Sequence, residues 1–149
     1  MRTNRLFILL TVLSSVFSSK VILAQSDSEI IRQLVMNAYV ESTQNLGSID
    51  EIRKGFHPSF TMFRQIDNEV KYTTLDEWIV SIEQRRKDAG GKLPRTEGKI
   101  LSIDITGTSA AVKMELHREG KLIFTDYLGL YKFKEGWRIV SKTYYRHPD

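Results

Sequence analysis

The N-terminal half of the chain contains a segment with apolar residues at helical spacing. Its apolar positions recur three and four residues apart, at Ile30, Ile31, Leu34, Val35, Ala38 and Tyr39. Ser26 with Glu29 three residues later matches a helix N-terminal capping box, and Gly47 suits a C-terminal cap. The spacing predicts a helix over residues 26–47.

The capping pattern recurs twice downstream. Ser48 begins a short helix that ends at Gly55, and Thr74 begins a longer helix that runs to Asp88. The longer helix turns four apolar residues inward, Leu75, Trp78, Ile79 and Ile82. We therefore expect three helices in total.

Much of the remaining sequence has the composition and alternation typical of strands. Two short strands are expected at residues 56–65 and 69–74, and four longer ones at 99–106, 109–117, 122–133 and 136–146. Turns that contain glycine join the four long strands as consecutive antiparallel hairpins. This order of elements predicts an α+β domain with its helices on one face of a sheet.

The strand "KLIFTDYLGLYKF" (residues 121–133) carries a single acid within an apolar row. Because side chains alternate between the two faces of a strand, Asp126 shares its face with Leu122, Phe124, Leu128 and Leu130. A carboxylate is costly to bury without a partner. The position therefore predicts that Asp126 contacts either another side chain or a ligand.

The first residues have the pattern of a secretory signal peptide. Arg2 and Arg5 precede an apolar run that is too short for a membrane-spanning helix, and Ala24 is a small residue suited to cleavage. We expect residues 1–24 to be removed and residues 25–149 to form one domain. Removal of Arg2, Arg5 and Lys20 leaves 19 basic against 18 acidic residues, so the net charge falls from +4 to +1. This loss of positive charge argues against nucleic-acid binding.

The sequence contains no cysteine. Disulfides and an acylated lipoprotein cysteine are therefore excluded. With the signal peptide, this predicts a periplasmic or secreted protein that does not contact the membrane after cleavage. Three scattered histidines give no metal-ligand spacing, and no glycine-rich phosphate loop occurs, so we expect no metal and no cofactor.

Three segments carry a resemblance to a known family: "AYVES" in the first helix, "FHPSF" after the second, and "FTDYLGLYKFKEGWRIVSKTYY" near the C-terminus. They resemble the nuclear-transport-factor-2-like (NTF2-like, or SnoaL-like) superfamily and its branch labelled "putative lumazine-binding", over nearly all of residues 25–147. The resemblance implies a cone-shaped fold in which a curved, mainly antiparallel sheet wraps around the helices and leaves a pocket. Members include ketosteroid isomerase, scytalone dehydratase and polyketide cyclases, but also binding and transport modules. Many form dimers through the outer face of the sheet.

This fold would place Asp126 in the pocket, either as a general base or as a protonated hydrogen-bond donor. A structural acid that binds backbone groups or a lysine across the sheet is the alternative. Lys142 is the candidate partner, and its position depends on the last hairpin. A three-residue turn at 134–136 puts Lys142 opposite Leu128 and within reach of Asp126, whereas a two-residue turn at 135–136 sends it to the other face. The sequence leaves both registers open.

His57 is the histidine expected nearest the pocket rim. It is a candidate general acid or base, with a locally hydrogen-bonded turn residue beside Pro58 as the alternative. Most aromatic residues are expected in the core, and some are expected to line an apolar pocket for a flat, ring-containing ligand. The residues expected to line this pocket are Tyr39, Phe60, Trp78, Phe124, Lys142 and Tyr144.

Three functions are compatible with these features. The first is an exported small-molecule-binding domain for an apolar or aromatic ligand, without demonstrated chemistry. The second is a cofactor-free isomerase, dehydratase or cyclase that uses Asp126, with His57, for proton transfer. The third is a dimeric interaction subunit whose cavity is filled by its own side chains. The strand around Asp126 has a second apolar row, at Ile123, Tyr127, Tyr131 and Phe133, which predicts a homodimer through the outer face of the sheet.

Overall fold

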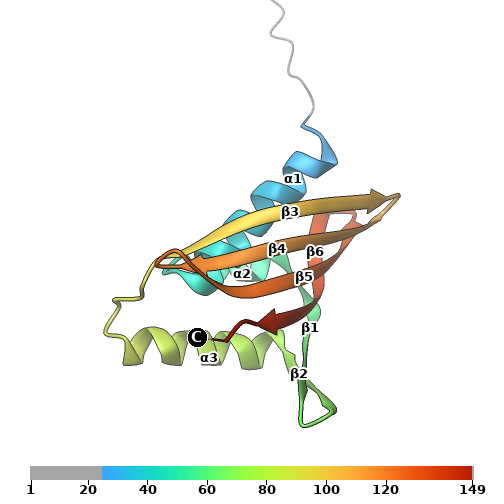
Figure 1. Cartoon of the computed structure of the whole chain (residues 1–149). Helices are drawn as coiled ribbons and strands as arrows, with labels where there is room; N and C mark the ends of the chain where they lie inside the picture. The colour runs from blue at the N-terminus through green and yellow to red at the C-terminus, as the bar shows by residue number, and fades with distance from the viewer. Residues whose placement is uncertain (1–24, 149) are drawn as a thin grey trace, which may run out of the picture.

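The computed structural model describes residues 25–148 of the chain (Figure 1). The signal peptide expected over residues 1–24 lies outside the described residues. Within 25–148, no helix is both long and apolar enough to cross a membrane.

The helical segments are α1 (Asp27–Leu34), η1 (Val35–Gln44), α2 (Ile49–Gly55) and α3 (Leu75–Asp88). The sequence predicted one regular helix over 26–47, but the structure changes after Leu34, where α1 continues directly into the π-helix η1. A π-helix has wider turns than an α-helix, with bonds that span five residues. The wider turns bring polar residues inward as well as Tyr39, and Ser42, Thr43 and Gln44 are all buried.

The strands are β1 (Phe56–Ile66), β2 (Glu69–Thr74), β3 (Thr96–Thr106), β4 (Ser109–Arg118), β5 (Lys121–Phe133) and β6 (Gly136–Arg146). They form one sheet in the order β2-β1-β6-β5-β4-β3. Neighbouring strands are antiparallel except β1 and β6, which run parallel. The strands match the predicted ones, although β3 begins three residues earlier, at Thr96.

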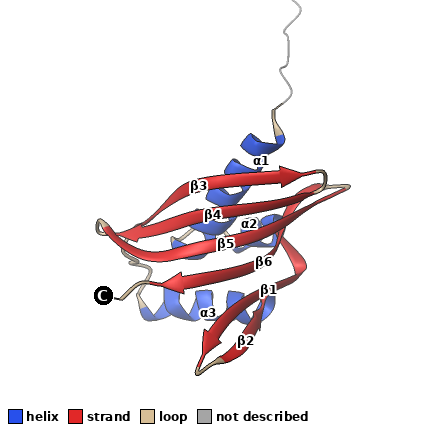
Figure 2. Cartoon of the chain, turned by 45° about the vertical axis from the view of Figure 1, so that its right-hand side comes forward, coloured by secondary structure: helices blue, strands red, loops and turns tan. Residues whose placement is uncertain are grey.

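The helices lie on one face of the curved sheet and leave the other face uncovered (Figures 1 and 2). The core fills the space between helices and sheet, with Ile31, Val35 and Tyr39 from the first two helical segments. Ile52 of α2, Trp78 and Ile79 of α3 and the inward residues of β1, β4, β5 and β6 also belong to this core. The predicted α+β fold, with its curved and mainly antiparallel sheet, is confirmed.

The β5–β6 hairpin combines features of both predicted registers. Its turn has two residues, Lys134 and Glu135, because Phe133 pairs with Gly136. The pairing then shifts between Gly129 and Leu130, since Leu130 faces Ile139 whereas Gly129 faces Ser141. Val140 is the extra residue of this β-bulge, which turns the inward side chains of β6 from odd to even positions. As a result Leu128 faces Lys142, the pairing predicted for the three-residue turn.

β1 and β6 run together over only part of their length. Their last paired residues are Met62 and Lys142. Beyond this point β1 bends away with β2, while β6 continues beside β5 (Figures 1 and 2). The ends of β1 and β6 are therefore not hydrogen-bonded to each other.

Candidate functional site

Three polar side chains meet inside the domain, and we refer to Tyr39, Asp126 and Lys142 as the polar cluster. The Tyr39 hydroxyl donates a hydrogen bond of 2.5 Å to Asp126 Oδ2, and Lys142 Nζ donates to the Tyr39 oxygen. Lys142 Nζ also lies 3.1 Å from Asp126 Oδ1. That contact is an ion pair without hydrogen-bond geometry, since Oδ1 has no hydrogen-bond donor among the described residues.

Each member of the polar cluster reaches this point for a local structural reason. Tyr39 lies on the buried side of η1. Asp126 follows the alternation of β5, in which Leu128 and Leu130 also point inward. Lys142 points inward because the bulge at Val140 changes the alternation of β6.

Four aromatic rings surround the Lys142 ammonium, and we call them the aromatic cage. The distances from Nζ to the ring centroids are 4.6 Å for Tyr39, 4.8 Å for Tyr144, 5.6 Å for Trp78 and 5.9 Å for Phe124. Aromatic faces within about 6 Å attract a cation through the quadrupole of the ring. The cage thus compensates part of the hydration that Lys142 loses on burial.

The polar cluster is closed to solvent. Tyr39 and Asp126 are 0% exposed and Lys142 is 4% exposed. Burial lowers the pKa of Lys142 below its ordinary value of 10.5, because it disfavours the charged amine, although Asp126 opposes this change. Burial, together with the charge and hydrogen bonding of Asp126, raises the pKa of Tyr39 well above 10.0. Tyr39 is therefore a neutral hydrogen-bond donor at physiological pH.

Most of the predicted pocket residues lie together. Tyr39, Phe124, Trp78, Lys142 and Tyr144 form the cage and the cluster, and Phe60 stacks on Trp78 with ring centroids 5.6 Å apart. Their proximity does not create an open pocket at this point, because Tyr39 and Asp126 have no accessible surface. The side chains close the interior to solvent at this point.

His57 lies apart from the polar cluster. Its ring stacks on Phe133, with centroids 4.6 Å apart, and its Nδ1 accepts a hydrogen bond from the backbone of Ser59. Phe133 is seven residues from Asp126 along β5, a separation of roughly 23 Å at about 3.3 Å per residue. The structure does not bring His57 and Asp126 to one site. The hydrogen bond of His57 to Ser59 is local, as the alternative predicted, although His57 lies in β1 and not in a turn.

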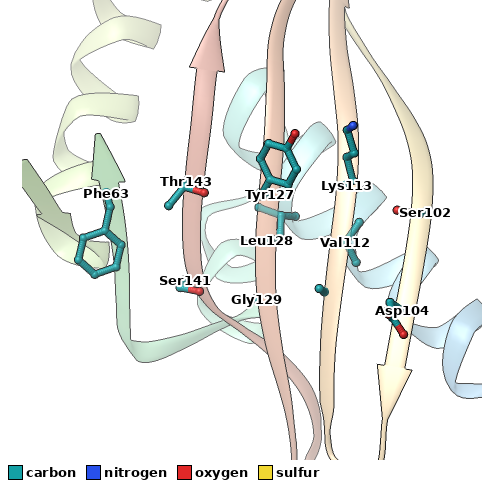
Figure 3. Close-up of a pocket in the computed structure, with 11 residues that line it drawn as sticks. Phe63, Ser102, Asp104, Val112, Lys113, Tyr127, Leu128, Gly129, Ser141 and Thr143 are labelled. Carbon is teal, nitrogen blue, oxygen red and sulfur yellow. The ribbon is translucent and has the colours of Figure 1, made fainter. Parts of the chain in front are cut away.

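Several hollows lie on the surface of the domain, and two of them bear on the site. The first, which we call the outer groove, has a volume of about 560 Å³ and lies on the helix-free face of the sheet. Figure 3 shows Lys113, Tyr127 and Phe63 projecting around it from β4, β5 and β1. Gly129 and Ser141 both line it, and a Cβ atom on Gly129 would lie only 2.4 Å from Ser141 Oγ, so a larger side chain would not fit there without movement of Ser141.

The second hollow, which we call the β1–β6 cleft, opens where these strands separate. Its volume is about 480 Å³, and its lining residues are Arg64, Gln65, Ile66, Tyr144, Tyr145 and Arg146. The sequence analysis missed this cleft, because the separation of two strands that are distant in sequence leaves no local pattern. It also missed the hydrogen bond of Tyr39 to Asp126, although Tyr39 was among the expected pocket residues.

No three histidine, cysteine, aspartate or glutamate side chains within 25–148 come together as they would around a metal ion. The polar cluster contains one carboxylate, one amine and one phenol. This set can donate and accept protons and can bind a carbonyl or hydroxyl group of an organic molecule.

Comparison with known proteins gives consistent relationships. Residues 26–145 match the family model described as "Putative lumazine-binding". The chain is 30% identical over 111 residues to a protein named "Aldolase FrzH" from Cladobotryum sp, and the match covers 74% of this chain and 84% of that protein.

Two solved structures share the fold. An NTF2-like protein of unknown function from Silicibacter pomeroyi DSS-3 has a TM-score of 0.65 at 25% identity, covering 83% of this chain and 100% of that one. Another, from Shewanella baltica OS155, has a TM-score of 0.61 at 24% identity, covering 83% of this chain and 95% of that one. The family match, the curved sheet and the helices on its inner face agree, and the chain belongs to the family described as "Putative lumazine-binding" within the NTF2-like superfamily.

Proposed function

We propose that this domain binds a small, ring-containing organic molecule at the polar cluster. The observation that carries this proposal is the burial of Tyr39, Asp126 and Lys142 among four aromatic rings. A buried ion pair stabilises a fold no better than well-packed apolar residues of similar volume. The stability of the fold therefore gives little reason for the burial of these polar groups, whereas the binding of a polar ligand gives one.

Ligand access requires a movement of cage side chains. Phe124 and Tyr144 are partly exposed, in contrast to Tyr39 and Asp126. Rotation of either ring would open space beside Lys142 without breaking the Tyr39–Asp126 hydrogen bond. A flat ligand would then replace the ring that has moved and stack on the remaining rings of the cage.

Native mass spectrometry of the protein purified from its own host tests this proposal. We expect a retained small molecule in the wild type and its loss in Asp126→Asn, which keeps the shape of the side chain but removes its charge. Asp104→Asn is the matched control, because Asp104 is an exposed acid of the outer groove. Equal retention in both variants would contradict the proposed site. Absence of any retained molecule or ligand-induced thermal shift would favour the interaction-subunit alternative.

Proton-transfer chemistry on a carbonyl compound is the second candidate. It is favoured by the similarity to a protein named as an aldolase, and by an acid and an amine 3.1 Å apart in the polar cluster. In this candidate Asp126 removes a proton next to the carbonyl while Lys142 and Tyr39 stabilise the developing oxyanion. His57 has no part in it.

Deuterium exchange tests this second candidate. We expect the protein to accelerate exchange next to the carbonyl of cyclohexanone in D₂O, measured by NMR, and Asp126→Asn to abolish the acceleration. An unchanged rate in Asp126→Asn would exclude Asp126 as the base.

We also propose that the outer face of the sheet binds a second copy of the chain. Tyr127 and Tyr131 are 48% and 50% exposed on this face, and Phe63 is 36% exposed beside them. Exposed aromatic residues on one face of a sheet are typical of an interface. Light scattering should give a dimer mass for the wild type and a monomer mass for Tyr127→Lys. A monomeric wild type at working concentration would contradict this proposal.

Export is the remaining proposal, and it is supported by the sequence of residues 1–24 alone. We expect the protein recovered from the periplasm or the medium to begin at Gln25. The intact mass of the secreted protein measures this directly, and a mass that includes residues 1–24 would contradict it.

A further inference from the structure

The β1–β6 cleft leads toward Lys142. The cleft begins just beyond the last strand pair, Met62 with Lys142, and its wall includes Tyr144. Tyr144 lies on the same face of β6 as Lys142, and its ring centroid is 4.8 Å from the Lys142 ammonium. The Tyr144 ring therefore lines the cleft and also contacts the amine.

The cleft has the size and the charge of a site for a small anion. Its volume of about 480 Å³ lies within the usual range of ligand pockets, about 300–1,000 Å³. Arg64 comes from β1 and Arg146 from β6, so the two strands each contribute a cation to the walls. None of its lining residues is acidic. A carboxylate is the organic group that such walls attract.

The surroundings of Lys142 suit a nucleophilic amine. Its Nζ is within reach of a carboxylate, at 3.1 Å from Asp126, and is hydrogen-bonded to the Tyr39 hydroxyl. Burial lowers its pKa, so a larger share of the amine is neutral than for an exposed lysine. Neutral amines attack carbonyl carbons, whereas ammonium ions do not.

We propose that the amine of Lys142 forms an imine with the carbonyl carbon of a small aldehyde or ketone that also carries a carboxylate and enters through the β1–β6 cleft. Arg64 and Arg146 hold the carboxylate, and displacement of the Tyr144 ring brings the carbonyl to Nζ. This inference rests on the proposed function, because it specifies the ligand class and the bonding at the same site.

The three side chains of the polar cluster supply the amine and every proton transfer that imine formation needs. Asp126 takes a proton from the Lys142 ammonium, and the amine then attacks the carbonyl carbon. The carbon–nitrogen bond forms, the carbonyl π electrons move to oxygen, and a proton passes from nitrogen to this oxygen by way of the Tyr39 hydroxyl. Asp126 next returns its proton to the resulting hydroxyl, the carbon–oxygen bond breaks, and water leaves. The products are a protonated imine and water, with Asp126 again a carboxylate.

Reductive trapping tests the proposal. The protein is incubated with 4-carboxybenzaldehyde and sodium cyanoborohydride, which reduces the imine to a stable secondary amine, and peptide mass spectrometry locates the adduct. We expect Lys142 to be labelled faster than Lys113, because burial lowers its pKa and leaves a larger share of its amine neutral. Lys113 is the matched control, because it is an exposed lysine 5.6 Å from the ring centroid of Tyr127. Labelling of Lys142 no faster than Lys113 would overturn the proposal.

Two further measurements test the route and the charge selectivity. Tyr144→Ala retains Lys142 and opens the cleft toward it, so its labelling should be faster than in the wild type. Benzaldehyde lacks the carboxylate, so it should label Lys142 more slowly than 4-carboxybenzaldehyde, and Arg64→Ala with Arg146→Ala should remove this difference. A slower Tyr144→Ala, or equal labelling by both aldehydes in the wild type, would contradict entry through the cleft.

A noncovalent probe distinguishes failure of the imine from failure of the binding site. 4-(Hydroxymethyl)benzoate has the same ring and carboxylate but no carbonyl. If it raises the melting temperature of the wild type but not of Asp126→Asn while the aldehyde gives no adduct, the binding function stands and the imine is excluded. If neither probe shifts the melting temperature or labels Lys142, both proposals fail for this ligand class.

Discussion

Two ion pairs connect to β5, and their distances are nearly equal. Asp126 of β5 lies 3.1 Å from Lys142, and Lys132 of the same strand lies 2.9 Å from Asp27 of α1. Their surroundings differ. The side chains of the inner pair are 0% and 5% exposed, whereas those of the outer pair are 34% and 43% exposed. Distance alone therefore says little about what an ion pair contributes, because the solvent that each charge loses determines its energy.

Breaking the inner pair on one side should have the largest effect. Asp126→Ala leaves Lys142 buried without its carboxylate, and we expect a loss of about 3–5 kcal/mol in the free energy of unfolding. Urea denaturation followed by circular dichroism measures this change. A loss below about 1 kcal/mol, typical of exposed pairs, would mean that Lys142 reaches solvent in the variant.

Replacing the whole polar cluster by apolar residues should have a smaller effect and of the opposite sign. The triple variant Tyr39→Phe, Asp126→Leu and Lys142→Met removes every charge and the hydroxyl together. We expect a free energy of unfolding between that of the wild type and about 4 kcal/mol above it. The same denaturation experiment, with loss of ligand retention as a second readout, would separate a functional role from a structural one. A triple variant as unstable as Asp126→Ala would show that the polar cluster is needed for folding.

The pH dependence of stability should differ more moderately between wild type and Lys142→Met. Because the folded pKa of Lys142 lies below its ordinary 10.5, the unfolded chain binds more protons between these two values. The contribution of Lys142 to stability is therefore fully present above 10.5 and is lost as the pH falls toward the lowered pKa. Tyr39 acts in the opposite direction above pH 10, because its raised pKa keeps it protonated in the folded state. Tyr39→Phe variants of both proteins isolate the lysine effect.

For this comparison, the free energy of unfolding is measured from pH 7 to 11 in the Tyr39→Phe background. The free energy of unfolding of the Tyr39→Phe, Lys142→Met double variant is subtracted from that of Tyr39→Phe alone. This difference should increase as the pH rises, because the variant that retains Lys142 is stabilised relative to the double variant. A pH-independent difference would mean that Lys142 titrates alike in the folded and unfolded states.

Breaking the outer pair should have the smallest effect. The Lys132 ammonium lowers the pKa of Asp27 by hydrogen bonding, but both side chains remain in contact with solvent. We expect Asp27→Asn to leave the free energy of unfolding unchanged within error, and the result to be the same at high salt. A loss comparable to that of Asp126→Ala would show that exposure does not separate these two pairs.

The sequence predicted features that depend on neighbouring residues better than features that depend on contacts between distant segments. Local signals predicted local features well, since the Thr74–Glu77 capping box is formed in full and the order of elements is as expected. Ser48, however, accepts a hydrogen bond from the backbone of Asp50 and not of Glu51. The π-helical turns of η1 were not predicted, because the same apolar stripe fits the first turns of either kind of helix.

The candidate site depended on features that sequence periodicity does not contain. Asp126 was expected to need a partner, and Lys142 was named for this role, but its facing depended on a turn that the sequence left open. Trp137 and Ile139 point inward at odd positions and Lys142 and Tyr144 at even ones. A change of parity within one strand is the signal that could have revealed the bulge. The filled interior around Asp126 depends on how side chains pack across the domain, which no single segment records.

The bulge at Val140 has a consequence for how such a domain can change during evolution. A β6 of the same length without this bulge would alternate regularly from Trp137 to Arg146, and every residue after Val140 would lie on the opposite face. Lys142 would then stand on the outer face near Tyr127, and Asp126 would lose its amine. A one-residue change in the register of β6 would thus exchange the chemistry of the interior with that of the surface, while the lengths and order of the strands stayed the same.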